Sequence, residues 1–124
     1  MTFEEALKRL AEREPKTFYW GEGHRFKWHF GIVDVATGLR VHTITQYHDG
    51  GVSEVTQDDI DEILAKIGWE YEVNHTHDQR AWTAWIWRVE DYITLNGRYT
   101  RPSPSKLEAA KSALLAVVEK EYPL

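Results

Sequence analysis

The chain has 124 residues, of which 42% are hydrophobic and 28% charged, and it contains no cysteine. This length is typical of one domain with its own core, so we predict a single domain over residues 1–124. The lack of cysteine excludes disulfides, thiolate metal sites and a cysteine nucleophile. The formal net charge of −5 argues against broad binding to nucleic acid, which requires a basic surface.

No apolar run like that of a signal peptide occurs in the N-terminal segment MTFEEALKRLAEREP. No stretch of the chain approaches the roughly 18 consecutive apolar residues that a membrane-spanning helix needs. We therefore expect a cytoplasmic protein with no membrane partner.

Residues 2–14 have the pattern of an amphipathic helix. Apolar residues recur at helical spacing at Phe3, Ala6, Leu7, Leu10 and Ala11. Thr2 is a favourable N-cap, and Glu5 three residues later completes the pattern of a capping box. Pro15 is predicted to end the helix.

Two alternating segments, residues 26–35 and 39–47, predict a β-hairpin with Gly38 in its turn. With a two-residue loop, one face would carry Phe26, Trp28, Phe30, Ile32, Val41, Thr43 and Tyr47. The other face would carry Lys27, His29, Arg40, His42 and His48. A bulge at Gly38 would shift the register and change this partition.

A second helix is predicted to begin after Thr56, which serves as its N-cap. Asp58 and Asp59 lie in its first turn, where the helix dipole favours negative charge. Its apolar stripe is Ile60, Ile63, Leu64 and Ile67. Gly68 stops the helix, and the alternation over residues 69–74 then predicts a third strand.

The segment over residues 80–95 admits two interpretations. As a strand, it would place Trp85, Trp87 and Val89 on one side and Trp82, Ala84 and Ile86 on the other. As a helix, it would have the apolar stripe Trp82, Trp85, Ile86, Val89, Tyr92 and Ile93. Because Trp, Ile, Val and Thr favour strands, we predict a strand that forms a second hairpin with residues 69–74.

A last helix is predicted to follow Ser103 as N-cap, with Pro104 at its first position. Its apolar stripe is Leu107, Ala110, Leu114, Val117 and Val118. The element order is therefore α-β-β-α-β-β-α. We predict an α+β fold in which two hairpins form one four-stranded antiparallel sheet that packs against the helices.

Residues 56–119 combine a short helix that ends at Gly68-Trp69, the strand Trp69-Glu70-Tyr71-Glu72-Val73, the segment Trp82-Thr83-Ala84-Trp85 and an alanine-rich helix over residues 109–117. In this pattern about half of the chain resembles small phage proteins that carry the phage ABA (alpha-beta-alpha) sandwich domain. The resemblance implies a small αβα sandwich encoded by a phage or prophage. It carries over no catalytic residues, and the first hairpin lies outside it.

Residues 24–29 interleave cations with aromatic rings, a pattern that also occurs in proteins that bind single-stranded nucleic acid. On a strand, the alternating charges and rings fall on opposite faces. We interpret the segment as an amphipathic core strand, and we do not expect nucleic acid as the partner. The alternative would use Arg25, Lys27, His29 and Arg40 to bind it.

The sharpest pattern of the metal-binding type is His75-x-His77-Asp78. On a strand, residues two apart point to the same side, so both imidazoles could reach one ion, with His42 or His48 completing the site. A polar hairpin loop with solvated histidines is the simpler interpretation, since two histidines at this spacing are common by chance. We predict no cofactor.

The chain contains six Trp, and Trp82, Trp85 and Trp87 fall within six positions. We expect Trp85 and Trp87 in the core and Trp82 on the opposite face of the sheet. There Trp82 either anchors a partner, as exposed aromatic rings do, or packs beneath a helix, and the sequence leaves both open. The candidate partner-binding residues are Trp82, Trp85, Trp87, His29 and Arg40.

No catalytic constellation stands out, so the sequence favours a small non-enzymatic protein that binds another protein. A phage-encoded accessory protein or inhibitor of a host system, acting in the bacterial cytoplasm, is the most concrete version. A homodimer is left open. The alternative is a metal-binding domain or metal-dependent hydrolase that uses His75, His77 and either His42 or His48.

Overall fold

The computed structural model of the chain describes residues 1–51, 55–78, 80–89 and 98–124. Its helices are α1 (Phe3–Arg13), α2 (Gln57–Lys66) and α3 (Lys106–Glu121). Its strands are β1 (Phe18–Gly21), β2 (Phe26–Val33), β3 (Arg40–Tyr47), β4 (Trp69–His75), β5 (Trp82–Arg88) and β6 (Arg98–Tyr99). The contacts gather into two compact units, Met1–Val55 and Thr56–Pro123, and the prediction of a single domain stays a prediction.

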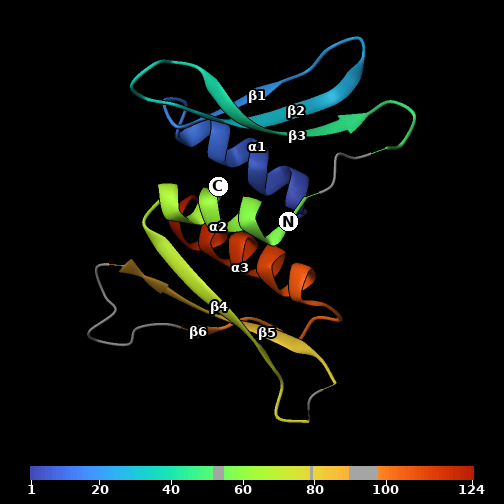
Figure 1. Cartoon of the computed structure of the whole chain (residues 1–124), viewed down its shortest axis with the longest axis vertical. Coiled ribbons are helices and arrows are strands. Elements are labelled where there is room, and N and C mark those ends of the chain that lie inside the picture. The colour runs from blue at the N-terminus through green and yellow to red at the C-terminus, as the bar shows by residue number, and fades with distance from the viewer. Residues whose placement is uncertain (52–54, 79, 90–97) are drawn as a thin grey trace. The chain divides into compact units, whose positions relative to one another are not determined.

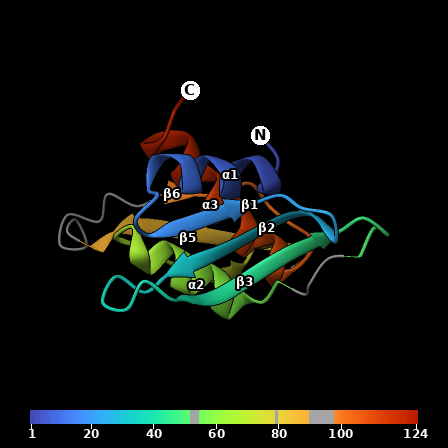
Figure 2. The same cartoon turned by 90° about the horizontal axis from the view of Figure 1, so that it is seen from above.

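The first unit is a three-stranded antiparallel sheet, in the order β1-β2-β3, with α1 packed on one face (Figures 1 and 2). The helix begins where the sequence predicts, because the backbone N–H of Glu5 donates to the Thr2 hydroxyl over 3.1 Å. The covered face of the sheet and the apolar side of the helix form the core. Its largest fully buried side chains are Leu7, Leu10, Phe18, Phe30, Ile32 and Ile44.

The predicted partition of the first hairpin is wrong for Val41 and Thr43 on β3, because the register is shifted near the turn. Ile32 pairs with His42 but Val33 pairs with Arg40, which leaves Val41 as an extra residue on β3. Val41 and Thr43, predicted on the core face, are therefore exposed, and Ile44 opposite Phe30 is buried instead. One extra residue exchanges the two faces of a strand, so the geometry near the turn determines which residues of β3 face the core.

A second irregularity separates Phe26 from the rest of β2. The register shifts between Phe26 and Trp28, so Phe26 leaves the predicted core face. Its ring lies 5.1 Å from the ring of His29, on the face that α1 does not cover. Tyr47, which pairs with Phe26, is 44% exposed.

The second unit places α2 and α3 side by side over a second antiparallel sheet, in the order β4-β5-β6 (Figure 1). The predicted N-cap of α2 is confirmed and forms a complete capping box, since Thr56 and Asp59 each accept a hydrogen bond from the other's backbone N–H. Gly68 follows the helix with φ +83°, a conformation that glycine adopts without strain. The chain thereby reverses directly into Trp69 and β4.

The interpretation of residues 80–95 as a strand is confirmed for β5, which pairs with β4 along its whole length. Arg80 and Ala81 precede β5 and Val89 follows it, so the strand is shorter than the predicted segment. Residues 90–95 lie outside the described residues. The α+β class with antiparallel sheets and helices is also confirmed. The single four-stranded sheet is wrong, because β1 completes a sheet with the first hairpin and β6 completes another with the second. A third strand stabilises each hairpin, since an isolated two-stranded hairpin is marginal in water.

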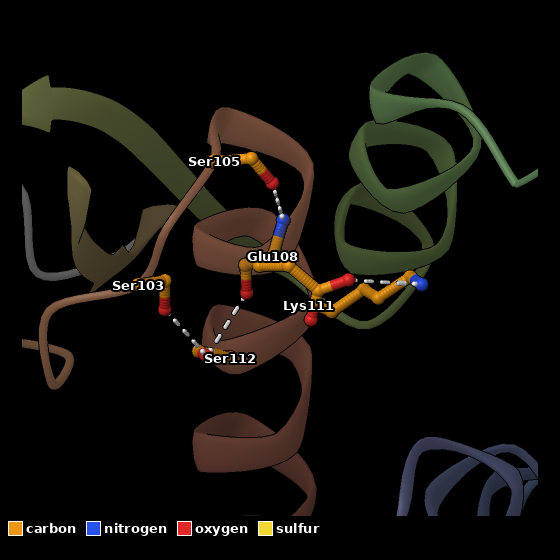
Figure 3. A network of polar contacts seen from close by, with 5 residues as sticks. All are labelled: Ser103, Ser105, Glu108, Lys111 and Ser112. Carbon is orange, nitrogen blue, oxygen red and sulfur yellow. Dashed lines mark hydrogen bonds and ion pairs between the residues drawn. The ribbon is translucent and has the colours of Figure 1, made fainter. Parts of the chain in front are cut away.

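The start of α3 differs from the prediction by two residues (Figure 3). Ser105, not Ser103, is the N-cap, and its hydroxyl accepts a hydrogen bond from the backbone N–H of Glu108 over 3.1 Å. Ser103 is unavailable as a cap because its backbone pairs with Trp82 in both directions, at 2.7 and 2.8 Å. Its hydroxyl lies 3.3 Å from the hydroxyl of Ser112 on α3, which ties the end of the sheet to the helix.

Of the helices in the described ranges, none combines the length and the apolar character needed to cross a membrane.

Candidate functional site

The two faces of the β4-β5-β6 sheet differ sharply in what covers them. Ala84 and Ile86 are buried on the face that packs against α2 and α3. On the same face, the Tyr71 hydroxyl donates to the carbonyl of Gln57 on α2 over 3.4 Å. Because side chains alternate along a strand, Trp85 and Trp87 point to the opposite face, away from the helices of this unit.

Aromatic rings and carboxylates share this open face, which consists of Glu70, Glu72, Trp85, Trp87 and Tyr99. Glu72, Trp85 and Tyr99 lie directly opposite one another across the three strands, and Glu70 lies opposite Trp87. The rings of Trp85 and Tyr99 are in contact, with centroids 4.7 Å apart and planes at 57°. Both glutamates are exposed, both indoles are partly exposed, and Tyr99 is 64% exposed.

The expected places of the three neighbouring tryptophans are therefore reversed. Trp82, predicted to be the exposed anchor, lies on the helix-covered side, where Lys106 of α3 is 4.9 Å from its ring and the ring of His75 is 3.7 Å away. Trp85 and Trp87, predicted in the core, lie on the open face. The alternation was correct, but the sequence could not show which side the helices would cover.

A hollow of about 300 Å³ continues the open face toward the β4–β5 turn. Its lining includes Asn74 and Thr83, which face each other on β4 and β5, and Tyr99 on β6. His75, Thr76 and His77 complete it. Apart from Tyr99, its lining residues carry amide, hydroxyl and imidazole groups.

The uncovered face of the first sheet holds a second cluster, around Tyr19. Tyr19 and Thr43 both lie directly opposite Gly31, one on each side of β2. Their hydroxyls are nevertheless 2.9 Å apart. Since the two outer strands of such a sheet are separated by roughly 9.6 Å, the Tyr19 ring must cross β2 above Gly31, where no side chain obstructs it.

His29 and Arg40 belong to this cluster, as the sequence predicted that they would share a face. The Tyr19 hydroxyl is 2.9 Å from Nε2 of His29, and the Thr45 hydroxyl is 3.2 Å from Nδ1. The Arg40 guanidinium lies 4.0 Å from the centre of the Tyr19 ring. Partial burial, and secondarily the positive charge of Arg40, lower the pKa of His29 below 6.5.

Of the four histidines predicted as metal ligands, His42 and His48 belong to the first unit, and His75 and His77 belong to the second. His75 is the last residue of β4 and His77 lies in the turn that follows, so strand alternation does not relate their side chains. Nε2 of His48 is 3.2 Å from the Gly23 carbonyl oxygen, and the backbone of His42 pairs with Ile32 on β2. In the part of the chain that the structure describes, no three His, Asp or Glu side chains are grouped so as to hold a metal ion.

Asp78, the carboxylate of the same motif, is used by the turn itself. It accepts hydrogen bonds from the Thr76 hydroxyl over 2.5 Å and from the backbone N–H of Arg80 over 3.2 Å. These hydrogen bonds, the first above all, hold the pKa of Asp78 below its ordinary value. The motif therefore has a local structural explanation as an Asp-centred turn.

Sequence analysis missed Tyr99, Glu70 and Glu72 as members of the open face, and Tyr19 as the centre of the second cluster. The two glutamates were already marked by their alternation with Trp69 and Tyr71, which assigns them to the side opposite the core. Tyr19 and Tyr99 lie on strands of only four and two residues, which are too short for a periodic signal.

Comparison of the chain with protein-family models, with curated proteins and with solved structures gave no match. The resemblance to phage ABA sandwich proteins therefore stays a prediction.

Proposed function

We propose that this chain is a non-enzymatic module that binds another protein through the open face of its β4-β5-β6 sheet. The observation that carries the proposal is the contiguous group formed by Trp85, Trp87 and Tyr99 on the face opposite the helices. Trp and Tyr are enriched at the energetic centres of protein interfaces, because they bury a large area with few rotatable bonds.

The distribution of all six tryptophans supports this proposal. Trp28 and Trp69 are buried, whereas Trp20, Trp82, Trp85 and Trp87 are partly exposed. Lys8 is 6.0 Å from the Trp20 ring and Lys106 is 4.9 Å from the Trp82 ring, so both of these indoles already have a cation of the chain itself beside them. Trp85 and Trp87 lie instead beside Glu72, Glu70 and Tyr99 on the open face, where a partner can contact them.

The resemblance of residues 56–119 to phage ABA sandwich proteins suggests the biological setting, a phage or prophage and its bacterial host. A phage-encoded module of this kind would act as an accessory protein or as an inhibitor that covers a functional surface of a host protein. Its site of action would be the bacterial cytoplasm. Inhibition by occlusion requires only a stable interface, and it needs no catalytic residues in the chain.

The test compares the wild-type chain with a Trp85→Thr/Trp87→Thr double variant as bait in bacterial lysates, followed by affinity measurement with each purified partner. Threonine keeps the preference for a strand and removes the aromatic area. Tyr47→Thr on β3, which removes another exposed aromatic ring, is the matched control. Loss of an interface centre costs about 2 kcal/mol or more, or roughly thirtyfold in affinity.

We expect a partner that binds the wild type and the control equally and the double variant at least thirtyfold more weakly. Circular dichroism and urea unfolding establish that the double variant is folded. If every captured partner binds the folded double variant as tightly as the wild type, the open face is not the binding site.

A further inference from the structure

The charged side chains that β4, β5 and β6 place on the open face have one sign. Glu70 and Glu72 are both exposed on this face, beside Trp87 and Trp85. The nearest cations of the neighbouring strands point to the other side: Arg88 pairs with Glu121 of α3, and Arg98 donates to the carbonyl of Ala116 over 3.2 Å. Among the residues of β4, β5 and β6 themselves, the charged side chains of this face are therefore both acidic.

The chain itself places cations over its tryptophan rings elsewhere in the same unit. On the helix-covered face, Arg88 and Lys120 lie 5.5 and 5.4 Å from the Trp69 ring, and Lys106 lies 4.9 Å from the Trp82 ring. No cation from residues 1–51, 55–78, 80–89 or 98–124 lies over Trp85 or Trp87. Each of these partly exposed indoles lies opposite a carboxylate of β4, and an indole and a carboxylate together attract a cation more strongly than either does alone.

The spacing of Glu70 and Glu72 along β4 matches the spacing of alternate side chains in an extended peptide. Glu70 and Glu72 are two residues apart on one strand, so their side chains recur about every 6.7 Å along the face. An extended segment that runs along β4 presents its own alternate side chains at the same interval. Two basic residues separated by one residue would meet both glutamates and both indoles in register.

We infer that the partner contributes an extended basic segment, with Lys or Arg at two alternate positions that pair with Glu70–Trp87 and Glu72–Trp85. This inference rests on the proposed function and adds the chemistry and the conformation of the docked segment. The Trp85–Tyr99 contact provides the apolar floor, and the hollow that Asn74 and Thr83 help to line receives the next alternate side chain. The carboxylates supply selectivity against acidic segments.

The experiment selects peptides from a random twelve-residue display library on the immobilised full-length chain, with the wild type and three variants in parallel. Glu70→Gln/Glu72→Gln removes the charge of the face and keeps its shape. Glu4→Gln/Glu5→Gln removes the same charge from the exposed first turn of α1 and controls for net charge. Trp85→Thr/Trp87→Thr removes both indoles of the open face, so a peptide that no longer binds this variant requires them.

Peptides that require Trp85 and Trp87 should be enriched in Lys or Arg at two positions that are separated by one residue. Resynthesised, they should bind Glu70→Gln/Glu72→Gln roughly three- to twentyfold more weakly than the wild type, given the strength of exposed ion pairs. Binding should weaken with added salt, and the Glu4→Gln/Glu5→Gln control should match the wild type.

Three results separate this inference from the proposed function. Peptides that depend on Trp85 and Trp87 but are neutral or acidic would overturn the basic segment and leave the binding face intact. Basic peptides that bind Glu70→Gln/Glu72→Gln and the wild type equally would also overturn the pairing with the two glutamates and leave the binding face intact. A selection in which no enriched peptide depends on the two tryptophans would contradict both.

Discussion

The hydroxyl of Tyr19 on β1 and the hydroxyl of Thr43 on β3 meet at 2.9 Å, although β2 runs between them. Gly31 is the β2 residue directly opposite both, and it is buried. The aromatic ring thus takes the place of the side chain that Gly31 lacks. Glycine weakens a strand by itself, so the ring offers the reason for its presence here.

We predict that Gly31→Val destabilises the protein by roughly 1–3 kcal/mol, because the new side chain collides with the Tyr19 ring. In a Tyr19→Ala background the same substitution should cost little, since valine favours strands and the obstructing ring is gone. Urea unfolding of the wild type, both single variants and the double variant gives the coupling between the two sites. An equal loss in both backgrounds would show that the backbone, not the ring, requires glycine.

The lowered pKa of His29 predicts a pH-dependent stability. The unfolded state, in which the pKa is about 6.5, takes up the proton more readily than the folded state. The contribution of His29 is therefore favourable above pH 6.5, declines as the pH falls toward the folded-state pKa, and is constant below it.

We expect the free energy of unfolding to fall less between about pH 8 and about pH 5 in His29→Gln than in the wild type. The other histidines are common to both proteins, so the difference between the two curves isolates His29. An NMR titration of the folded wild type measures the same pKa directly. A value at or above 6.5 would contradict the prediction.

The N-cap of α3 provides a prediction that distinguishes Ser105 from Ser103. Ser105→Ala should destabilise the protein by about 1 kcal/mol, because the backbone N–H of Glu108 loses its acceptor. Ser105→Asp should keep most of the stability, since aspartate caps helices as well as serine does. Urea unfolding compares the three proteins. Equal losses for alanine and aspartate would mean that capping is not the role of Ser105.

Local signals determined which parts of the fold the sequence could predict. The first two helices carry a side-chain cap at Thr2 or Thr56 and a periodic apolar stripe, and both begin as expected. Ser103 and Ser105 are equally good caps by residue type. Only the pairing of Ser103 with Trp82, a contact between residues far apart in sequence, decides between them.

The sheets required information that periodicity does not contain. The shift at Val41 depends on the geometry of the turn, and β1 and β6 are recognised only by the partners that they pair with. The face of Trp85 depends on where α2 and α3 pack. Alternation groups residues by face, but it does not say which face is covered, and the candidate site depended on that choice.

A stability comparison of Ile86 with Trp85, its neighbour on β5, tests this assignment of faces. Ile86 is 1% exposed on the helix-covered face, so Ile86→Ala should cost about 2–5 kcal/mol through lost burial and the cavity left behind. Trp85 is partly exposed on the open face, where its ring contacts the Tyr99 ring, so Trp85→Thr should cost less than Ile86→Ala despite removing a larger side chain.

Urea unfolding measures both variants, and Ile86→Val extends the range to a milder change that should cost about 0.5–1.5 kcal/mol. The test is whether Ile86→Ala loses more stability than Trp85→Thr, although isoleucine is the smaller side chain. A loss for Trp85→Thr that equals or exceeds the loss for Ile86→Ala would place the Trp85 ring in the core. The open face would then lack the aromatic centre on which partner binding depends.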